Sequence, residues 1–350
     1  MTEGLYLRPT GFVYGAAAKR AATDGHAGFL AGGPVAFTCA EVIQGTPGDN
    51  RKELRSFAEL DASDEQAIRA LLDAITAPRT AIGSLSLDQP RIMGVVNVTP
   101  DSFSDGGLHA TTDAAIAHAL ELAKEGADIL DIGGESTRPG SDPVSAEDEV
   151  TRVLPVIEGL KKAGCMISVD TRKSAIMEQA LSAGAHMLND VSALTHDPGS
   201  LKVAAKSGLP AVLMHAQGDP KTMQDDPVYK DVILEVFDYL AGRIAACEAA
   251  GIDKSRIIAD PGIGFGKTLE HNLALLDAMS LFHGLGVALM LGVSRKRFIG
   301  TLTHVENPRD RSPGSIAAAL GGIAQGVQLV RVHDVAATHQ ALSVWSAVNS

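Results

Sequence analysis

Eight short apolar segments alternate with longer segments of helical composition from Arg91 to the end of the 350-residue chain, and this alternation constrains the fold more than any other feature. Most of these segments do not alternate polar and apolar residues, which is typical of parallel strands buried on both faces. One strand and its amphipathic helix take about 30 residues, so eight such units fill about 250. The pattern predicts an α/β fold, a closed (β/α)8 barrel over residues 91–350. Its strands are expected at 92–98, 128–133, 166–170, 186–191, 211–215, 257–261, 287–293 and 328–332.

The first 90 residues do not follow this alternation. Helices are expected at 15–22 and 64–76, a strand at 34–43, a turn cluster at 45–50 and a linker at 78–90. The pattern predicts a small N-terminal α/β extension packed on the barrel, of unknown function. It contains no catalytic constellation, and Arg8, His26 and Glu41 are expected to be surface or cap residues. Removing the extension is therefore expected to leave the chemistry in place.

Polar residues stand at the end of every expected barrel strand. In a parallel barrel the carboxyl ends of all strands meet at one face, where active sites of this fold lie. One such residue could simply cap a helix, but eight in register are hard to explain as caps. The sequence therefore predicts a site at this face. The strand-end residues are Asn97, Glu135, Asp170, Asn189 with Asp190, His215, Asp260, Ser294 to Lys296, and Arg331 with His333.

Charge and composition disfavour several classes of function. The net charge is -12, which argues against a nucleic-acid or anionic-membrane surface. No apolar run reaches the roughly 20 residues of a membrane span, and no signal-peptide pattern opens the chain. Three widely spaced cysteines, Cys39, Cys165 and Cys247, have no metal-binding spacing and are expected to be reduced. We expect a cytoplasmic protein whose partners are small molecules.

Several long motifs follow one another along the barrel region: IMGVVNVTPDSFSDGG at 92–107, DIGGESTRPG at 131–140, SVDTR at 168–172, LNDV at 188–191, LMHAQG at 213–218, PKTMQ at 220–224, DPGIGFGK at 260–267, SRK at 294–296 and RVHDV at 331–335. In sequence and order they resemble the motifs of the dihydropteroate synthases, a family of pterin-binding enzymes. The resemblance implies a transferase that joins 4-aminobenzoate to 6-hydroxymethyl-7,8-dihydropterin pyrophosphate and releases pyrophosphate with Mg2+. It also implies a homodimer, although no residue in the sequence specifies an oligomeric state.

The pterin ring is apolar on its faces and rich in hydrogen-bonding groups at its edge, so its pocket needs buried carboxylates and amides. Asp170, Asn189 and Asp260 can supply them from three strands. The resemblance places the Lys296 ammonium on the carbonyl side of the ring, and Met214 and Ser294 among the substrate-binding residues. Asp260 precedes Pro261, so the alternative is that it only begins a turn.

The leaving pyrophosphate gains negative charge as the C–O bond breaks, so cationic groups should stand near it. Arg331 and His333 are one residue apart at the end of the last strand and are expected on one face of it. By resemblance, Asn97 is the protein ligand of Mg2+; taken alone, an Asn before Thr-Pro is a turn former. His215 is expected to be a structural histidine at the pterin floor.

Two polar loops, 99–107 and 136–143, are expected to cover the site. The resemblance implies that Arg138 helps to hold pyrophosphate and that Asp101 stabilises positive charge at the pterin methylene. The 4-aminobenzoate pocket is expected to be lined by Phe103, Thr137, Pro139 and Phe265. Phe103 could instead anchor its loop in the core.

Arg297 departs from the family pattern, because many members carry a small hydroxyl residue at this position. In the family this position lies near the carboxylate of 4-aminobenzoate, so Arg297 either strengthens that contact or points to solvent.

The sequence leaves two other functions open. One is a pterin-binding methyltransferase, which would not need Asn97, Arg138 and both loops. The other is a non-catalytic pterin-binding paralogue, which loss of Arg331, His333 or Asp101 would favour; all three are present.

Overall fold

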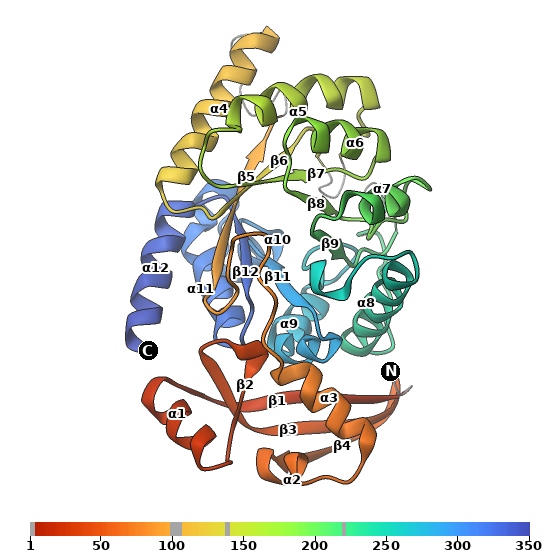
Figure 1. Ribbon diagram of the computed structural model, residues 1–350, viewed down its shortest axis with the longest axis vertical. Helices are drawn as coiled ribbons and strands as arrows, with labels where there is room; N and C mark the ends of the chain where they lie inside the picture. The colour runs from red at the N-terminus through yellow and green to blue at the C-terminus, as the bar shows by residue number, and fades with distance from the viewer. Residues whose placement is uncertain (1–3, 99–106, 137–140, 219–221) are drawn as a thin grey trace.

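Eight parallel strands close into a barrel in the computed structural model, which describes residues 4–98, 107–136, 141–218 and 222–350 (Figure 1). The order around the barrel is β5-β6-β7-β8-β9-β10-β11-β12, with β12 paired to β5, so the (β/α)8 prediction is confirmed. The strands are β5 (Arg91–Asn97), β6 (Ile129–Gly133), β7 (Met166–Asp170), β8 (Met187–Asp190), β9 (Ala211–Met214), β10 (Ile257–Asp260), β11 (Ala288–Gly292) and β12 (Leu329–Val332).

Helices surround the barrel, and the apolar residues of the strands are buried on both faces, which is why their sequences lack polar alternation. The main helices are α4 (Gly107–Lys124), α5 (Ala146–Leu160), α6 (Ser174–Ala183), α7 (Ser200–Ser207), α8 (Val232–Ala249), α9 (Leu269–Asp277), α10 (Arg297–Thr303), α11 (Ser312–Ile323) and α12 (Val335–Val348). Short 3-10 segments are η3 (Lys254–Arg256), η4 (Met279–Leu285) and η5 (Pro308–Arg311).

The expected linker also closes the floor of the barrel. Ile82 and Leu85 exchange backbone hydrogen bonds of 2.9 Å in a narrow turn. Ile82 and Leu87 are buried in one cluster with Met93 and Met187, at the N-terminal ends of the strands. This segment therefore contributes to the barrel core.

The extension holds an antiparallel sheet in which β3 (Val35–Thr46) pairs with β1 (Leu5–Tyr14) on one side, and with β2 (Gly28–Phe29) and β4 (Asp49–Ser56) on the other. Its helices are α1 (Gly15–Thr23), α2 (Phe57–Asp61) and α3 (Gln66–Thr76), with a 3-10 turn η1 (Leu30–Gly32). The helices expected at 15–22 and 64–76 and the strand expected at 34–43 are present.

Strands β1 and β4 were not predicted, for two physical reasons. β1 contains Pro9 and Gly11, which usually interrupt strands, but Pro9 is tolerated because β1 pairs on one side only. β4 is polar along its length and mostly exposed, so it carries no alternating apolar face. Its strand conformation comes from hydrogen bonding to β3, which a local pattern does not report.

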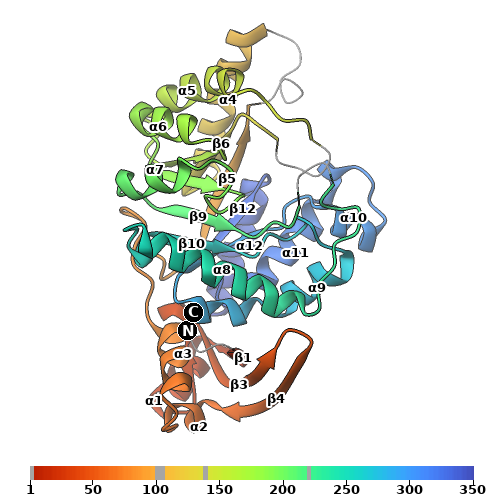
Figure 2. The ribbon, with the colours of Figure 1, turned by 90° about the vertical axis from the view of Figure 1, so that its right-hand side faces the viewer.

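The extension packs along the side of the barrel, beneath α8 and α9 and against η4 and α12 (Figures 1 and 2). Every residue of η4 is buried. Tyr14 donates from its hydroxyl to Ala324 O at 3.0 Å and contacts Trp345 of α12 edge to face, at 6.0 Å between ring centroids. Arg8 and Glu41 form an ion pair of 3.3 Å, so these two residues connect elements as well as lying near the surface.

Two further expectations concern thiols and membranes. Cys39, Cys165 and Cys247 are all free, as predicted. Within the described ranges, no helix has the length and apolar character needed to cross a membrane.

Candidate active site

A buried network of charged side chains occupies the barrel interior near the carboxyl ends of its strands. Arg331 donates from Nε to Asp131 Oδ2 at 2.6 Å and from Nη2 to Asp170 Oδ2 at 2.7 Å. Asn189 donates from Nδ2 to the same Asp131 oxygen at 3.0 Å. Asp131, Asn189 and Arg331 come from β6, β8 and β12, as expected for interior residues of alternate barrel strands. The structure thus brings Arg331, Asp170 and Asn189 together, as the strand-end pattern predicted.

Asp131 and Asp170 share the guanidinium of Arg331, and this sharing shifts the pKa values of Asp170 and Arg331. Burial raises the pKa of Asp170 to about 7; Arg331 opposes this rise, and the neighbouring Asp131 adds to it. Although burial alone would lower the pKa of Arg331, the two carboxylates raise it above its usual range. Asp131 Oδ1 and Asp170 Oδ1 are buried without a hydrogen-bond partner among the described residues. The network therefore has acceptor capacity left for a ligand with N–H donors.

Asp260 ends β10 and faces Lys296 across a space left by a glycine. A Cβ at Gly292 of β11 would lie 3.7 Å from Lys296 Nζ and 3.8 Å from Asp260 Oδ2. Lys296 Nζ lies 4.7 Å from the centre of the Phe265 ring and also donates to Ile263 O. Burial raises the pKa of Asp260, and Lys296 is the main opposing influence. The expected carboxylate, ammonium and aromatic ring therefore converge on one place.

The turn after Asp260 depends on glycine. Asp260 Oδ1 accepts from Gly262 N at 2.7 Å, so the carboxylate does begin a turn while it faces the site. Gly262 has φ +68°, and a Cβ there would lie 1.9 Å from His215 O. Any other residue would push β10 and β9 apart. Met214, at the end of β9, packs beside this glycine and is buried.

Lys267 holds this loop together from within. Its buried ammonium lies 2.9 Å from His215 Nδ1 and donates to Gly262 O at 2.9 Å and to Phe265 O at 3.0 Å. Burial lowers the pKa of His215 to about 2, with Lys267 adding to this effect, so the imidazole is neutral. His215 is thus a buried, hydrogen-bonded histidine, in line with the structural role expected for it.

The turns after β11 and β12 are joined through Ser294. Its hydroxyl accepts from His333 N at 3.1 Å and lies 3.0 Å from His333 Nδ1, which orients that ring. Arg295 pairs with Asp334 in two hydrogen bonds of 3.0 and 2.5 Å. Arg297 is exposed at the first position of α10, which agrees with the solvent-facing alternative.

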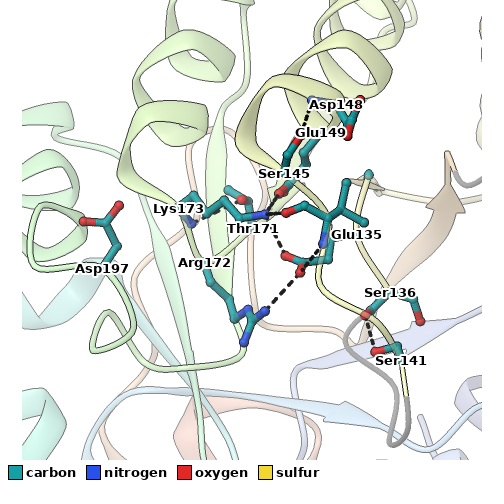
Figure 3. A network of polar contacts seen from close by, with 12 residues as sticks. Glu135, Ser136, Ser141, Ser145, Asp148, Glu149, Thr171, Arg172, Lys173 and Asp197 are labelled. Atoms are coloured by element: carbon teal, nitrogen blue, oxygen red, sulfur yellow. Dashed lines mark hydrogen bonds and ion pairs between the residues drawn. The ribbon is translucent and has the colours of Figure 1, made fainter. Parts of the chain in front are cut away.

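Glu135, the strand-end residue after β6, belongs to a second network (Figure 3). Lys173 Nζ donates to Glu135 Oε2 at 3.0 Å and to Glu149 Oε2 at 2.5 Å, and Arg172 Nη2 donates to Glu135 Oε1 at 3.1 Å. Burial alone would raise the pKa of Glu135, but the bonds from Lys173 and Val144 lower it. Val144 is held from both sides, since its N–H donates to Glu135 and its carbonyl accepts from Lys173 at 2.7 Å. These charges fix the C-terminal end of the 136–144 loop.

Asn97 ends β5 beside Gly133, at the same face. The described ranges contain no cluster of three or more His, Cys, Asp or Glu residues arranged to hold a metal ion. Five expected site residues lie outside the described residues: Asp101, Phe103, Thr137, Arg138 and Pro139.

Two residues of the site were not singled out from the sequence. Asp131 interrupts an otherwise apolar strand, and that interruption was the available signal, since a lone carboxylate inside a buried strand needs a partner. Lys267 follows the glycine-rich turn and gives no comparable signal, because a lysine after a turn is usually solvated. Its burial appears only in the folded chain.

Comparison with known proteins agrees with this geometry. Residues 93–333 match the family described as pterin binding enzymes. The dihydropteroate synthase of Escherichia coli K12 is 48% identical over 268 residues, which cover 76% of this chain and 94% of that protein. A structure of Xanthomonas albilineans dihydropteroate synthase with 4-aminobenzoic acid has a TM-score of 0.74 at 52% identity, and covers 78% of this chain and 98% of that one. A structure of the same enzyme with 7,8-dihydropteroate has a TM-score of 0.71 at 50% identity, and covers 78% and 99%.

The barrel, its buried carboxylates and the family match define a pterin-binding transferase. Within that class, the chain belongs to the dihydropteroate synthase family.

Proposed function

We propose that this enzyme condenses 6-hydroxymethyl-7,8-dihydropterin pyrophosphate with 4-aminobenzoate to give 7,8-dihydropteroate and pyrophosphate. The observation that carries this proposal is the set of buried carboxylates and cations, from strands around the barrel, that converge at the catalytic face. This set suits a flat heterocycle with several N–H donors and one carbonyl. Membership of the family supplies the reaction.

Asp170, Asn189 and Asp260 are the proposed anchors of the pterin edge, with Lys296 at its carbonyl. Among the described residues no donor meets the buried Asp170 Oδ1, which can therefore accept from a pterin N–H. Gly292 carries no side chain, so the Lys296 ammonium and the Asp260 carboxylate both approach this position of β11, where the ring edge is proposed to bind. Met214 packs at the end of β9 and can support one apolar face of the ring.

Arg331 and His333 are proposed to act beneath and beside the reacting methylene. Arg331 is held by Asp131 and Asp170, so it supplies a fixed positive charge at the pterin floor. His333, oriented by Ser294, is proposed to bind the leaving pyrophosphate together with Arg138. As the C–O bond breaks, the electron pair leaves with pyrophosphate, Asp101 stabilises the positive methylene, and the arylamine nitrogen forms the new C–N bond and loses a proton. An arylamine is already neutral at pH 7, so no strong base is needed.

Asn97, at the end of β5, offers a neutral oxygen that suits Mg2+ arriving with the pyrophosphate. One oxygen of Asp131 and one of Asp170 are already bound by Arg331. Mg2+ commonly takes one or two protein oxygens and completes its shell with phosphate oxygens and water. When bound, the ion would neutralise charge on the leaving pyrophosphate, and Asn97 is the residue proposed to hold it.

The 4-aminobenzoate pocket is proposed to include Phe265, Phe103, Thr137 and Pro139, with the exposed Arg297 at its solvent edge, on the side of the carboxylate. Phe265 is half-buried beside the Lys296 ammonium, so its ring can bound the pterin and amine sites together. A sulfonamide that mimics 4-aminobenzoate should therefore compete for this pocket.

The remaining proposals concern the catalytic domain, the oligomeric state and the cellular compartment. We propose that residues 91–350 form the catalytic unit and that the chain forms a homodimer in a reducing compartment such as the cytoplasm. Val344 and Val348 of α12 are 62% and 77% exposed, which supplies apolar surface for a second copy. The three free thiols are compatible with reducing conditions. Light scattering of the purified chain tests the dimer.

The decisive experiment incubates the enzyme with the pterin pyrophosphate, 4-aminobenzoate and Mg2+, and follows pyrophosphate release and dihydropteroate formation. Release that depends on 4-aminobenzoate supports the proposal. Tight pterin binding without turnover would support the non-catalytic alternative. Capture of a corrinoid protein, with methyl transfer from a folate, would support the methyltransferase.

A further inference from the structure

We propose that the N-terminal extension is a positioning element for the pterin site. It holds the two helices, α8 and α9, that carry and brace the glycine-rich loop 262–267. The functional part of this inference rests on the proposed pterin site; the mechanical part does not. In Figure 2 the strands of the extension run beneath α8 and α9.

The first set of contacts fixes α8. Tyr6 of β1 donates its hydroxyl to Asp238, in the middle of α8, with 2.9 Å to each carboxylate oxygen. The tip of the β3–β4 hairpin reaches the N-terminal end of the same helix. There, Asn50 Nδ2 donates to Asp231 Oδ2 at 3.3 Å, and Gly48 lies against Lys230, since a Cβ at Gly48 would be 3.3 Å from Lys230 Cβ. The extension therefore restrains α8 at two points.

The second set of contacts fixes the C-terminal end of α9. Arg8 Nη2 donates to Asp277 Oδ2 at 2.7 Å and to Asp277 O at 2.9 Å, where the helix ends. Ser280, in the η4 segment that follows, donates its buried hydroxyl to Pro9 O at 2.7 Å. A cation bound to the last carbonyl of a helix also stabilises the negative end of its dipole.

The same two helices bind the loop that follows Asp260. Just before α8, the Tyr229 hydroxyl donates to Gly266 O at 2.8 Å, and Glu235 in the first turn of α8 accepts from Lys230 N and Asp231 N at 2.6 and 3.0 Å. In the first turns of α9, the buried Asn272 accepts from Gly264 N at 2.6 Å.

The two helix starts also contact each other. The Tyr229 and His271 rings meet edge to face, at 4.9 Å between centroids. The extension, the helices and the loop thus form a continuous series of contacts that ends at Phe265, Lys267 and Asp260.

This arrangement gives the extension a role that its own sequence does not suggest. The loop 262–267 contains three glycines with positive φ, so its shape depends on what it is bonded to. The family match begins at residue 93, after the extension. The extension therefore adds to this chain a restraint on the loop that comes from outside the matched barrel.

The test uses the full-length enzyme and the double variant Tyr6→Phe/Asn50→Ala, which removes the polar contacts to α8 without touching a site residue. The control variant is Arg55→Ala, which breaks two ion pairs of β4 with Glu53 and Glu65 inside the extension. The first readout is amide hydrogen exchange of residues 262–266 without ligand. The second is the split between KM for the pterin pyrophosphate and kcat.

In the double variant we expect the amide exchange rate of residues 262–266 and the KM for the pterin pyrophosphate to rise about three- to tenfold. This range corresponds to the loss of one or two hydrogen bonds whose effect is transmitted through a network. We expect kcat to stay nearly unchanged. The control should change neither. Asn50→Asp, which places a second carboxylate beside Asp231, should increase loop exchange more than Asn50→Ala. If the double variant does not fold, the comparison of Asn50→Asp with Asn50→Ala carries the test.

Folded variants with wild-type loop exchange and wild-type pterin KM would overturn the proposal. If the wild-type enzyme binds no pterin, the proposed function fails, but loop exchange still decides whether the extension restrains the loop.

Discussion

Replacing Lys267 by methionine tests how the pterin loop is held. Methionine has a similar length and volume but no N–H donors, so the loop keeps its packing and loses its internal hydrogen bonds. The three closest acceptors would lose their donor: Gly262 O, Phe265 O and His215 Nδ1, at 2.9 to 3.0 Å from the ammonium.

The magnitude follows from these partners. A buried acceptor left unsatisfied costs roughly 1–3 kcal/mol, so three acceptors cost about 3–9 kcal/mol. The variant avoids burying an ammonium, which offsets several kcal/mol of that loss. We expect a net loss of about 2–4 kcal/mol in the free energy of unfolding.

A pH dependence accompanies this loss. Burial lowers the pKa of Lys267 well below its usual value, so between its folded pKa and about 10.5 the unfolded chain binds more protons than the folded chain. This group's contribution to wild-type stability should therefore rise with pH across that window and fall as pH drops through the folded pKa. The variant should lack that rise.

Urea unfolding at about pH 8 and pH 10, followed by far-UV circular dichroism, measures both effects. Lys124→Met is the matched control, because Lys124 is 76% exposed on α4 and the same substitution there should change stability by less than about 0.5 kcal/mol. If Lys267→Met unfolds at the wild-type midpoint at both pH values, the hydrogen bonds of Lys267 do not hold the loop and this reasoning is wrong.

Four further predictions test the site and the extension. Asp260→Asn should weaken a pterin analogue by about 2–4 kcal/mol in calorimetry, as for a charged hydrogen bond in a buried site, and unchanged affinity would remove Asp260 from the pocket. Because burial raises the pKa of Asp170, wild-type affinity for the analogue should fall as pH drops through the raised pKa of this carboxyl. Asp170→Asn should bind more weakly with a flatter profile in that range, and an equal slope in both proteins would assign the titration elsewhere. Asn97→Ala should raise the Mg2+ concentration needed for half-maximal activity without changing the melting temperature, and a superimposable titration would make Asn97 a turn residue. Deleting residues 1–78 uncovers the buried apolar side chains of η4, at about 1.5–3 kcal/mol each, so the shortened chain should precipitate or melt far below the full chain; a well-folded, active truncation would contradict this.

The deletion marks where reasoning from the sequence and reasoning from the structure diverge. The sequence holds no catalytic residue in the extension, so its removal appeared harmless. In the folded chain the extension covers η4 and binds Asp238, Asp231 and Asp277. Contacts across more than 180 residues of sequence leave no trace in local composition, because neither partner is marked by its own neighbours in the chain.

The sequence by itself determined the barrel and the face that carries the site. Strands that are buried on both sides must be continuously apolar. A polar residue at the end of each strand can therefore be recognised from the sequence alone. The motifs then indicated the family and its expected site residues, among them Asp170, Asn189, Asp260 and Arg331.

Only the tertiary structure decided how those residues are paired. The guanidinium of Arg331 binds Asp131 and Asp170, and its place at a strand end did not specify those partners. Lys267 could have been solvated, but it lies inside the glycine-rich loop. β4 could have been a loop, but it pairs with β3 and carries its hairpin to α8. In each case the outcome depends on the cost of burying a charge or a backbone group without a partner, and that cost is set by neighbours distant in the sequence.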